Sequence, residues 1–138
     1  KILNKDSITP IILGKNTLLA RDISSDIAST KYMLVGKTDL LEAIYILSSA
    51  TVVISNDSGL MHVASATNTK KMISLFGSSS PKYTPPLANI EKSTIIYKSL
   101  KCSPCFKKEC PLQHLDCMTQ ITPSEVYSSI TNNLLRAD

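Results

Sequence analysis

One stretch of the sequence, residues 54–64 (ISNDSGLMHVA), places an acid, a hydroxyl, a glycine and a histidine within six residues. It follows the apolar run at 51–54, which is typical of a buried strand, and its later part is predicted to begin a helix. In open α/β sheets, ligands bind beyond the carboxyl ends of the strands, where helices begin. The unpaired N–H groups and the dipole of a helix start attract phosphate. The stretch therefore predicts an anion-binding turn.

Each polar residue of this turn suits a different part of a phosphate-linked sugar. Gly59 allows the backbone to approach a ligand closely, and Ser58 can donate a further hydrogen bond. His62 lies four residues after Ser58 on the same helix face, where it can donate to a phosphate oxygen that leaves with developing charge. Asp57 would repel phosphate and is better suited to accept hydrogen bonds from sugar hydroxyls.

The same residues are compatible with two other interpretations of the turn. In the simpler one, Asp57 or Ser58 is only a helix cap and His62 is a surface histidine, because Asp and Ser are common caps. A hydrolase is disfavoured, because the nucleophile elbow reads G-x-S-x-G and Asn56 and Leu60 occupy its glycine positions here. A Ser-His-Asp triad also needs a histidine that faces the serine and is oriented by a separate acid.

Short apolar strands alternate with helical segments along the chain. Strands are predicted at 10–13, 32–35, 51–54, 72–76 and 94–97. Helices are predicted at 17–29, 38–49, 58–66 and 123–135, the last capped by Thr122 with Pro123 in its first position. The second helix has an apolar stripe that is expected to pack on a sheet, formed by Leu40, Ala43, Ile44 and Leu47. The predicted fold class is α/β, a Rossmann-like parallel sheet with helices on both faces.

Composition and charge narrow the classes of protein. The 138 residues fit one domain, and 43% hydrophobic with 19% charged residues are ordinary globular values. No apolar run approaches the roughly 18 residues of a membrane-spanning helix. Residues 1–6 contain neither a signal peptide nor an initiating Met, so we expect a fragment of a longer protein. Nucleic acid is not an expected partner, because the net charge is only +4, Trp is absent and the lysines are scattered apart from Lys70-Lys71 and Lys107-Lys108.

All four cysteines fall within residues 101–118, with the spacing C-x2-C-x4-C-x6-C and with His114 among them. Four thiolates around a tetrahedral zinc would hold together a loop of low apolar content. The spacing is not that of a standard zinc finger, so free thiols remain the alternative, and disulfides are disfavoured in a cytosolic enzyme. The candidate ligands of a structural zinc are Cys102, Cys105, Cys110 and Cys117.

Four ordered blocks follow one another along the chain: VGKTDL at 35–40, ISNDSGLMHVA at 54–64, LFGSSSP at 75–81 and TPPL at 84–87. They resemble glycosyltransferase family 9, and the likeness extends from about residue 11 to the carboxyl end. The resemblance implies the GT-B fold, two Rossmann-like domains that face each other across a cleft. Residues 1–138 would be the second, C-terminal nucleotide-sugar-binding domain, incomplete at its start, with a cysteine-rich loop at 101–118 and without the N-terminal acceptor domain.

The activity implied by the resemblance is inverting and metal-independent, with no required cofactor. Heptose (L-glycero-D-manno-heptose) would pass from ADP-heptose to the lipopolysaccharide inner core. The acceptor lipid would be bound by the missing domain, and the protein would be cytoplasmic, at the inner face of the inner membrane, with peripheral contact only. The alternatives are a family 9 transferase for another nucleotide sugar and a stand-alone nucleotide- or metal-binding module.

The resemblance also implies roles for single residues. Asp57 would hold heptose hydroxyls, and His62 would lie near the diphosphate. The helix-start N–H groups that would bind the diphosphate belong to Ser58, Gly59 and Leu60. The adenine would be framed by residues after a neighbouring strand, Gly36, Lys37 and Thr38. No residue of the chain is expected to deprotonate the acceptor hydroxyl, so the base is expected in the missing domain and the isolated chain is expected to be inactive, at best a weak ADP binder.

Overall fold

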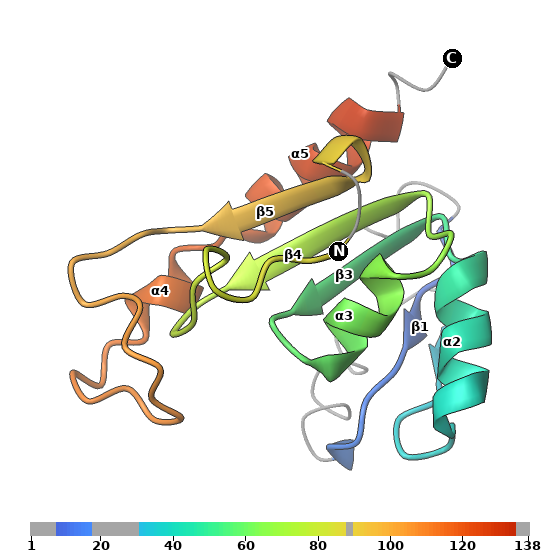
Figure 1. The fold of residues 1–138 in the computed structure, drawn as a ribbon, viewed down its shortest axis with the longest axis horizontal. Coiled ribbons are helices and arrows are strands. Elements are labelled where there is room, and N and C mark those ends of the chain that lie inside the picture. The colour runs from blue at the N-terminus through green and yellow to red at the C-terminus, as the bar shows by residue number, and fades with distance from the viewer. Residues whose placement is uncertain (1–7, 18–30, 88–89, 135–138) are drawn as a thin grey trace. The chain divides into compact units, whose positions relative to one another are not determined.

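The computed structural model describes residues 8–17, 31–87 and 90–134 (Figure 1). The chain divides into two compact units, residues 1–45 and 46–138. Among the described residues, two parallel strands lie in the first unit and three in the second. No helix within the described ranges is both long enough and apolar enough to cross a membrane.

The first unit contains a short pair of parallel strands. β1 (Ile11–Ile12) pairs with β2 (Tyr32–Met33), and both lie within strands predicted from the sequence. The pairing includes backbone bonds of 3.0 Å from Tyr32 N to the carbonyl oxygen of Pro10 and from Leu34 N to that of Ile12. The helix predicted at 17–29 lies outside the described residues, apart from Thr17.

α2 (Leu40–Ser49) begins in the first unit and ends in the second. Asp39 and Glu42 cap it reciprocally, because each carboxylate accepts the backbone N–H of the other residue, at 2.8 and 2.9 Å. Ala43 and Leu47 are buried, as the predicted apolar stripe requires. The prediction is wrong at Leu40, which is 60% exposed. A side chain in the first turn points back toward the amino end of the helix, beyond the part that packs.

The second unit is built on a three-stranded parallel sheet of order β3-β4-β5. Its strands are β3 (Val52–Asn56), β4 (Lys71–Phe76) and β5 (Ser93–Tyr97), each close to its predicted position. β4 is central and almost entirely buried, since both of its edges are paired and both of its faces are covered. This buried position explains why most residues of the strand are apolar.

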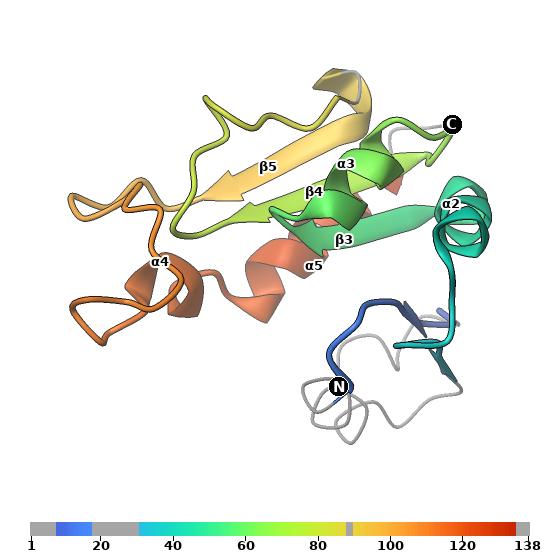
Figure 2. The same cartoon turned by 60° about the horizontal axis from the view of Figure 1, so that its bottom comes forward.

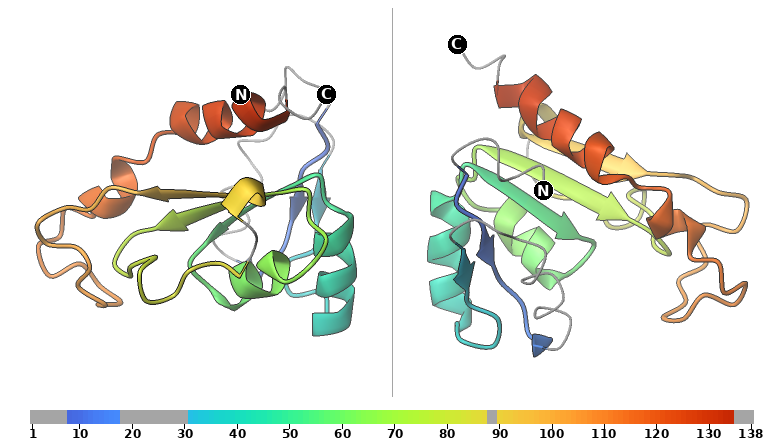
Figure 3. Two further views of the ribbon diagram at one scale, coloured as in Figure 1. Left: turned by 45° about the horizontal axis from the view of Figure 1, so that its top comes forward. Right: turned by 180° about the vertical axis from the view of Figure 1, so that it is seen from behind.

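Helices cover both faces of this sheet, as predicted. α3 (Gly59–Ser65) packs on one face against β3 and β4, and α5 (Pro123–Leu134) packs on the other against β4 (Figures 2 and 3). The predicted cap of α5 is confirmed, because Thr122 Oγ1 accepts the N–H of Glu125 at 3.2 Å. The core under α5 is formed by Ile73, Ile96 and Ile130, with Val52, Leu75, Ile121 and Val126 packed around them.

Irregular segments connect these elements. Residues 77–86 form a loop, and a short 3-10 helix, η1 (Ile90–Lys92), precedes β5. Residues 101–118, called the cysteine loop below, follow β5 and run into the short helix α4 (Asp116–Thr119). The cysteine loop lies beyond the carboxyl ends of β4 and β5, the edge of a parallel sheet at which ligands bind (Figure 1).

Candidate functional site

Ser58 is the N-cap of α3, as the simpler interpretation of the turn requires. Its backbone is extended, and its Oγ accepts the N–H of Met61 at 3.3 Å. The same Oγ lies 3.3 Å from Ser55 Oγ. The hydroxyl is thus engaged within the protein. Among the described residues no hydrogen bond joins it to His62, so the hydrolase interpretation gains no support from the geometry.

The start of α3 leaves two backbone donors open. Met61 N and His62 N both donate to the carbonyl oxygen of Ser58, at 3.0 and 3.3 Å. Within the described ranges, no acceptor is found for the N–H groups of Gly59 and Leu60. A Cβ built on Gly59 would meet no atom within 4 Å, so the space beside the first residue of α3 is open. The two N–H groups without an acceptor among the described residues therefore lie next to open space.

Asp57 is held in place from three directions. Its backbone N–H donates to the carbonyl oxygen of Leu75 at 3.0 Å, which ties the end of β3 to β4. Its Oδ2 accepts a hydrogen bond from Thr84 Oγ1 at 3.2 Å, and its Oδ1 lies 3.7 Å from His62 Nε2. The carboxylate is largely shielded, with 18% of the side chain exposed. His62 and Thr84 therefore fix the orientation of a carboxylate at the end of a strand.

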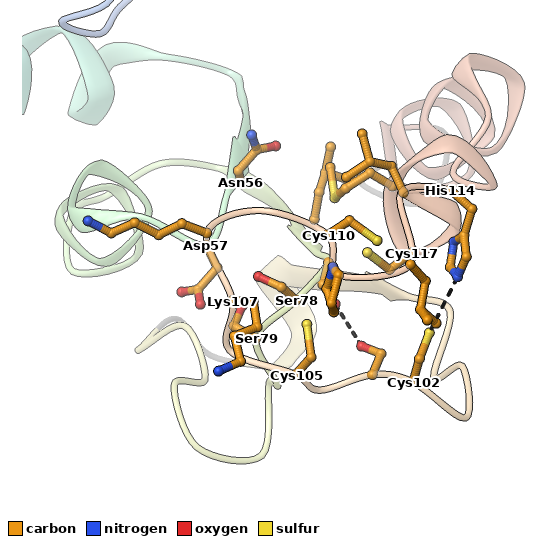
Figure 4. Close-up of a pocket in the computed structure, with 18 residues that line it drawn as sticks. Asn56, Asp57, Ser78, Ser79, Cys102, Cys105, Lys107, Cys110, His114 and Cys117 are labelled. Carbon is orange, nitrogen blue, oxygen red and sulfur yellow. Dashed lines mark hydrogen bonds between the residues drawn. The ribbon is translucent and has the colours of Figure 1, made fainter.

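A pocket of about 250 Å³ opens at the carboxyl ends of β3 and β4 (Figure 4). One side of it is polar and comes from the strand ends and the loop after β4: Asn56, Asp57, Gly77, Ser78 and Ser79. The other side comes from the cysteine loop. Of the residues that the sequence assigned to the second unit's ligand site, only Asp57 lines this pocket.

The remaining predicted site residues lie elsewhere. Ser58, Gly59, Leu60 and His62 follow Asp57 into α3 and are not part of the pocket lining. Gly36, Lys37 and Thr38 follow β2 in the first unit, where Gly36 has a φ of 70° and Lys37 N donates to the carbonyl oxygen of Leu34 at 3.1 Å. Their role in framing an adenine stays a prediction.

Contacts between distant segments attach the cysteine loop to the end of β4. Ser103 Oγ donates to the carbonyl oxygen of Gly77 at 2.7 Å, and Phe106 N donates to that of Ser78 at 2.8 Å. Met118 packs so closely on Gly77 that a Cβ there would lie 2.6 Å from its Sδ. Gly77 is therefore required for this approach. The sequence located the loop and its cysteines but gave no signal that the loop returns to β4.

All four cysteines are free thiols, and all four line the pocket (Figure 4). The backbone N–H of Leu115 is the main cause that lowers the pKa of the Cys110 thiol. Burial raises the pKa of the Cys117 thiol, and the neighbouring thiols raise it further. His114 Nδ1 accepts the N–H of Asp116 at 2.9 Å, while its Nε2 lies 4.0 Å from Cys102 Sγ.

The arrangement of these thiols does not form a metal site as it stands. Within the described ranges, no three side chains of His, Cys, Asp or Glu are grouped so that they could hold a metal ion. The structure brings Cys102, Cys105, Cys110 and Cys117 to one pocket but not to one point. Zinc binding therefore stays a prediction of the sequence.

A parallel sheet covered by helices, with a pocket at the carboxyl ends of its strands, defines an α/β ligand-binding fold. Within that class, the family model of glycosyltransferase family 9 (heptosyltransferase) matches residues 14–116, and the chain belongs to this family. The likeness seen in the four sequence blocks is thereby confirmed.

The chain is similar to named relatives and to solved structures. It is 52% identical over 63 residues to lipooligosaccharide heptosyltransferase 2 of Haemophilus influenzae, which covers 46% of this chain and 17% of the relative. It is 32% identical over 105 residues to lipopolysaccharide heptosyltransferase 2 of Escherichia coli, which covers 76% of this chain and 29% of the relative. The chain thus spans less than a third of the length of either relative.

The solved structures agree with the fold. The structure of ADP-heptose lipopolysaccharide heptosyltransferase II of E. coli matches with a TM-score of 0.78 and 26% identity, over 98% of this chain and 39% of that one. A glycosyltransferase family 9 structure from Veillonella parvula matches with a TM-score of 0.74 and 18% identity, over 92% of this chain and 36% of that one. The α/β fold class predicted from the sequence is confirmed.

Proposed function

We propose that residues 1–138 are the C-terminal, donor-binding part of an inverting heptosyltransferase. The longer enzyme transfers L-glycero-D-manno-heptose from ADP-heptose to the inner core of lipopolysaccharide and needs no metal for the reaction. The observation that carries the proposal is a shielded carboxylate, Asp57, in a pocket at the strand ends of a chain that belongs to the heptosyltransferase family. Support comes from relatives that are named lipopolysaccharide heptosyltransferase 2.

Asp57 accepts hydrogen bonds from heptose hydroxyls in this proposal. Thr84 and His62 hold its carboxylate in one orientation, so little order has to be imposed when the sugar binds. The open N–H groups of Gly59 and Leu60 bind the diphosphate together with Ser58, and His62 lies beside it. Gly36, Lys37 and Thr38 frame the adenine.

The reaction forms a bond between the acceptor oxygen and the anomeric carbon as the bond from that carbon to ADP breaks. A base must remove the proton of the acceptor hydroxyl, and we assign it to the part of the enzyme that binds the acceptor. The residues described in this chain act by orienting the sugar and by stabilising the charge that develops on the departing ADP. We therefore assign no catalytic base within residues 1–138.

Partners and location follow from this activity. The donor is ADP-heptose, and the acceptor is the inner-core lipid, which is held by the acceptor-binding part of the enzyme. The site of action is the cytoplasmic face of the inner membrane, with peripheral contact only, and no nucleic acid takes part. A family 9 transferase that uses another nucleotide sugar would share the same pocket. A metal-binding module is the other alternative, and only the four thiols that line the pocket favour it.

Turnover by the full-length protein tests the proposal. We expect transfer from ADP-heptose to an inner-core acceptor and a loss of about 100-fold in kcat/KM for Asp57→Asn, because hydrogen bonds from sugar hydroxyls to a charged group are lost. Thr84→Val is the matched variant, since it keeps the carboxylate and removes one hydrogen bond that orients it. Turnover retained by a folded Asp57→Asn enzyme, or faster turnover with another nucleotide sugar than with ADP-heptose, would contradict the proposal.

A further inference from the structure

Two lysines of the cysteine loop reach the pocket that contains Asp57. Lys107 and Lys108 both line it, although about fifty residues of sequence separate them from β3. In Figure 4, Lys107 lies on the side of Asp57, Ser78 and Ser79, whereas Cys110, Cys117 and His114 lie on the other side. Lys107 therefore belongs to the polar part of the pocket, next to the carboxyl ends of β3 and β4.

The backbone that carries these lysines is fixed to the sheet. Phe106, directly before Lys107, donates its N–H to the carbonyl oxygen of Ser78 at 2.8 Å. Its ring packs edge-on against Tyr83, with 5.9 Å between the ring centres. Ser103, on the same loop, donates to the carbonyl oxygen of Gly77 at 2.7 Å. These three contacts hold the start of the lysine pair at the end of β4.

The charges of the lysines are not neutralised by the protein. Within the described ranges, neither Lys107 nor Lys108 forms an ion pair with a carboxylate. Asp57 is the only carboxylate among the described residues that line the pocket, and its neighbours are His62 and Thr84. Two lysines and one carboxylate therefore contribute to the pocket lining, so its charge balance favours an anion.

The size of the pocket indicates which part of a ligand it holds. Its volume of about 250 Å³ is below the roughly 300 to 1,000 Å³ of pockets that enclose a whole small-molecule ligand. Lysine is a point charge on a flexible stem and a common phosphate ligand, and the Ser78 and Ser79 hydroxyls beside it can donate to phosphate oxygens. The pocket thus suits the phosphate groups of a nucleotide and the sugar beside them.

We propose that Lys107 and Lys108 are donor-binding residues of the cysteine loop that pair with the phosphates of a nucleoside diphosphate bound next to Asp57. The inference rests on the proposed function and adds to it the source of positive charge. It gives the cysteine loop a role in the site. The contacts to Gly77 and Ser78 position two lysines, whose positive charge the residues of the sheet do not supply.

Calorimetric titration of the full-length protein with ADP tests this inference. The Lys107→Ala/Lys108→Ala double variant is expected to bind ADP about tenfold more weakly than the wild type, because charge-assisted contacts to phosphate are lost. The salt dependence of binding should become shallower, and Lys107→Arg/Lys108→Arg should retain most of the affinity. Lys101→Ala is the matched control, since Lys101 is an exposed lysine of the same loop that does not line the pocket.

The outcomes separate this inference from the function on which it rests. If the wild type binds ADP and the double alanine variant binds it equally well, the lysines have no such role, while the proposed function stands. An equal loss in Lys101→Ala would also overturn the inference, because the effect would then be one of overall charge. If the wild type shows no ADP binding, both the proposed function and the lysine assignment fail.

Discussion

Gly59 begins α3, and the space around it is open. A substitution there can therefore change ligand binding without disturbing the fold. We expect Gly59→Ala to fold normally, because a Cβ there meets nothing within 4 Å and alanine favours helix by about 1 kcal/mol over glycine. ADP binding should nevertheless weaken, since a diphosphate bound to the open N–H groups must approach the backbone closely and the methyl group narrows that approach. Thermal unfolding and calorimetry on one preparation check both expectations.

Gly36 is the matched control for this variant. Its φ of 70° lies in the left-handed region, where a side chain costs about 1 to 2 kcal/mol, while the nearest atom to an added Cβ, Thr17 Cγ2, is 3.6 Å away. Gly36→Ala should therefore lower the free energy of unfolding through backbone strain. If Gly59→Ala lost stability to the same extent, or bound ADP as well as the wild type, the proposed use of its N–H group would be wrong.

Single residues of the site could be predicted from the sequence where local pattern decides. Asp57 follows an apolar strand, and the structure places it in a pocket at the strand end. Ser58 was predicted with two roles, and its role as a cap is confirmed. Lys107 stands out in the sequence only as part of a charge pair, because its place in the pocket depends on contacts between the cysteine loop and Ser78 that no spacing in the sequence encodes.

β4 contains a polar side chain at a position that burial would favour as apolar. Ser74 is fully buried, and its Oγ has no hydrogen-bond partner among the described residues. We expect Ser74→Ala to raise the free energy of unfolding by about 1 kcal/mol, because an unsatisfied buried hydroxyl is removed. Urea unfolding at a fixed pH measures the change.

Ser65 in α3 is the matched variant, since it is buried but satisfied. Its Oγ donates to the carbonyl oxygen of His62 at 2.8 Å and accepts the N–H of Leu87 at 3.0 Å. Ser65→Ala should therefore lower the free energy of unfolding by about 1 to 2 kcal/mol, because it leaves the Leu87 N–H without a partner. If Ser65→Ala and Ser74→Ala lowered the free energy of unfolding equally, Ser74 would have a hydrogen-bond partner that the described contacts do not include.

The junction of β4 and the cysteine loop depends on the absence of a side chain at Gly77. A Cβ there would lie 2.6 Å from Met118 Sδ and 2.9 Å from its Cγ, so Gly77→Ala must displace Met118. We expect a lower melting temperature and weaker ADP binding for Gly77→Ala. Adding Met118→Ala should restore part of both, because the second change removes the clashing atoms. If the effects of the two substitutions on melting temperature and ADP binding simply added in the double variant, the clash with Met118 would be excluded as the cause of the Gly77→Ala defect.

For the whole molecule, the sequence predicted the α/β class and the family, because alternating strands and helices and the four ordered blocks are continuous features of the chain. β4 reads as a buried strand, and the structure places it at the centre of the second sheet. The irregular parts could not be derived in the same way. Nothing periodic in residues 101–118 indicates that Ser103 and Phe106 contact the backbone after β4. The extent of the pocket was therefore beyond prediction.

The state of the four thiols decides how the whole chain responds to metal and to chelators. We expect free thiols, because no three of the candidate ligands are grouped around one point within the described ranges. The intact mass of the reduced protein should then equal that of the chain alone, and a zinc chelator should leave the melting temperature unchanged. Zinc bound in a one-to-one ratio, with a fall in melting temperature on chelation, would instead establish the structural zinc predicted from the cysteine spacing.

The order in which the free thiols react follows from their surroundings. The thiolate is the reactive form, so Cys110, whose pKa is lowered by the Leu115 N–H, should react with an alkylating reagent at lower pH than the others. Cys117 should react last, since burial raises its pKa and so lowers its fraction of thiolate. Mass spectrometry after partial alkylation at several pH values gives this order, and Cys110→Ser should remove the fastest phase. If all four thiols resisted alkylation together, and a chelator made all of them reactive together, a shared metal would explain the result better than four separate environments.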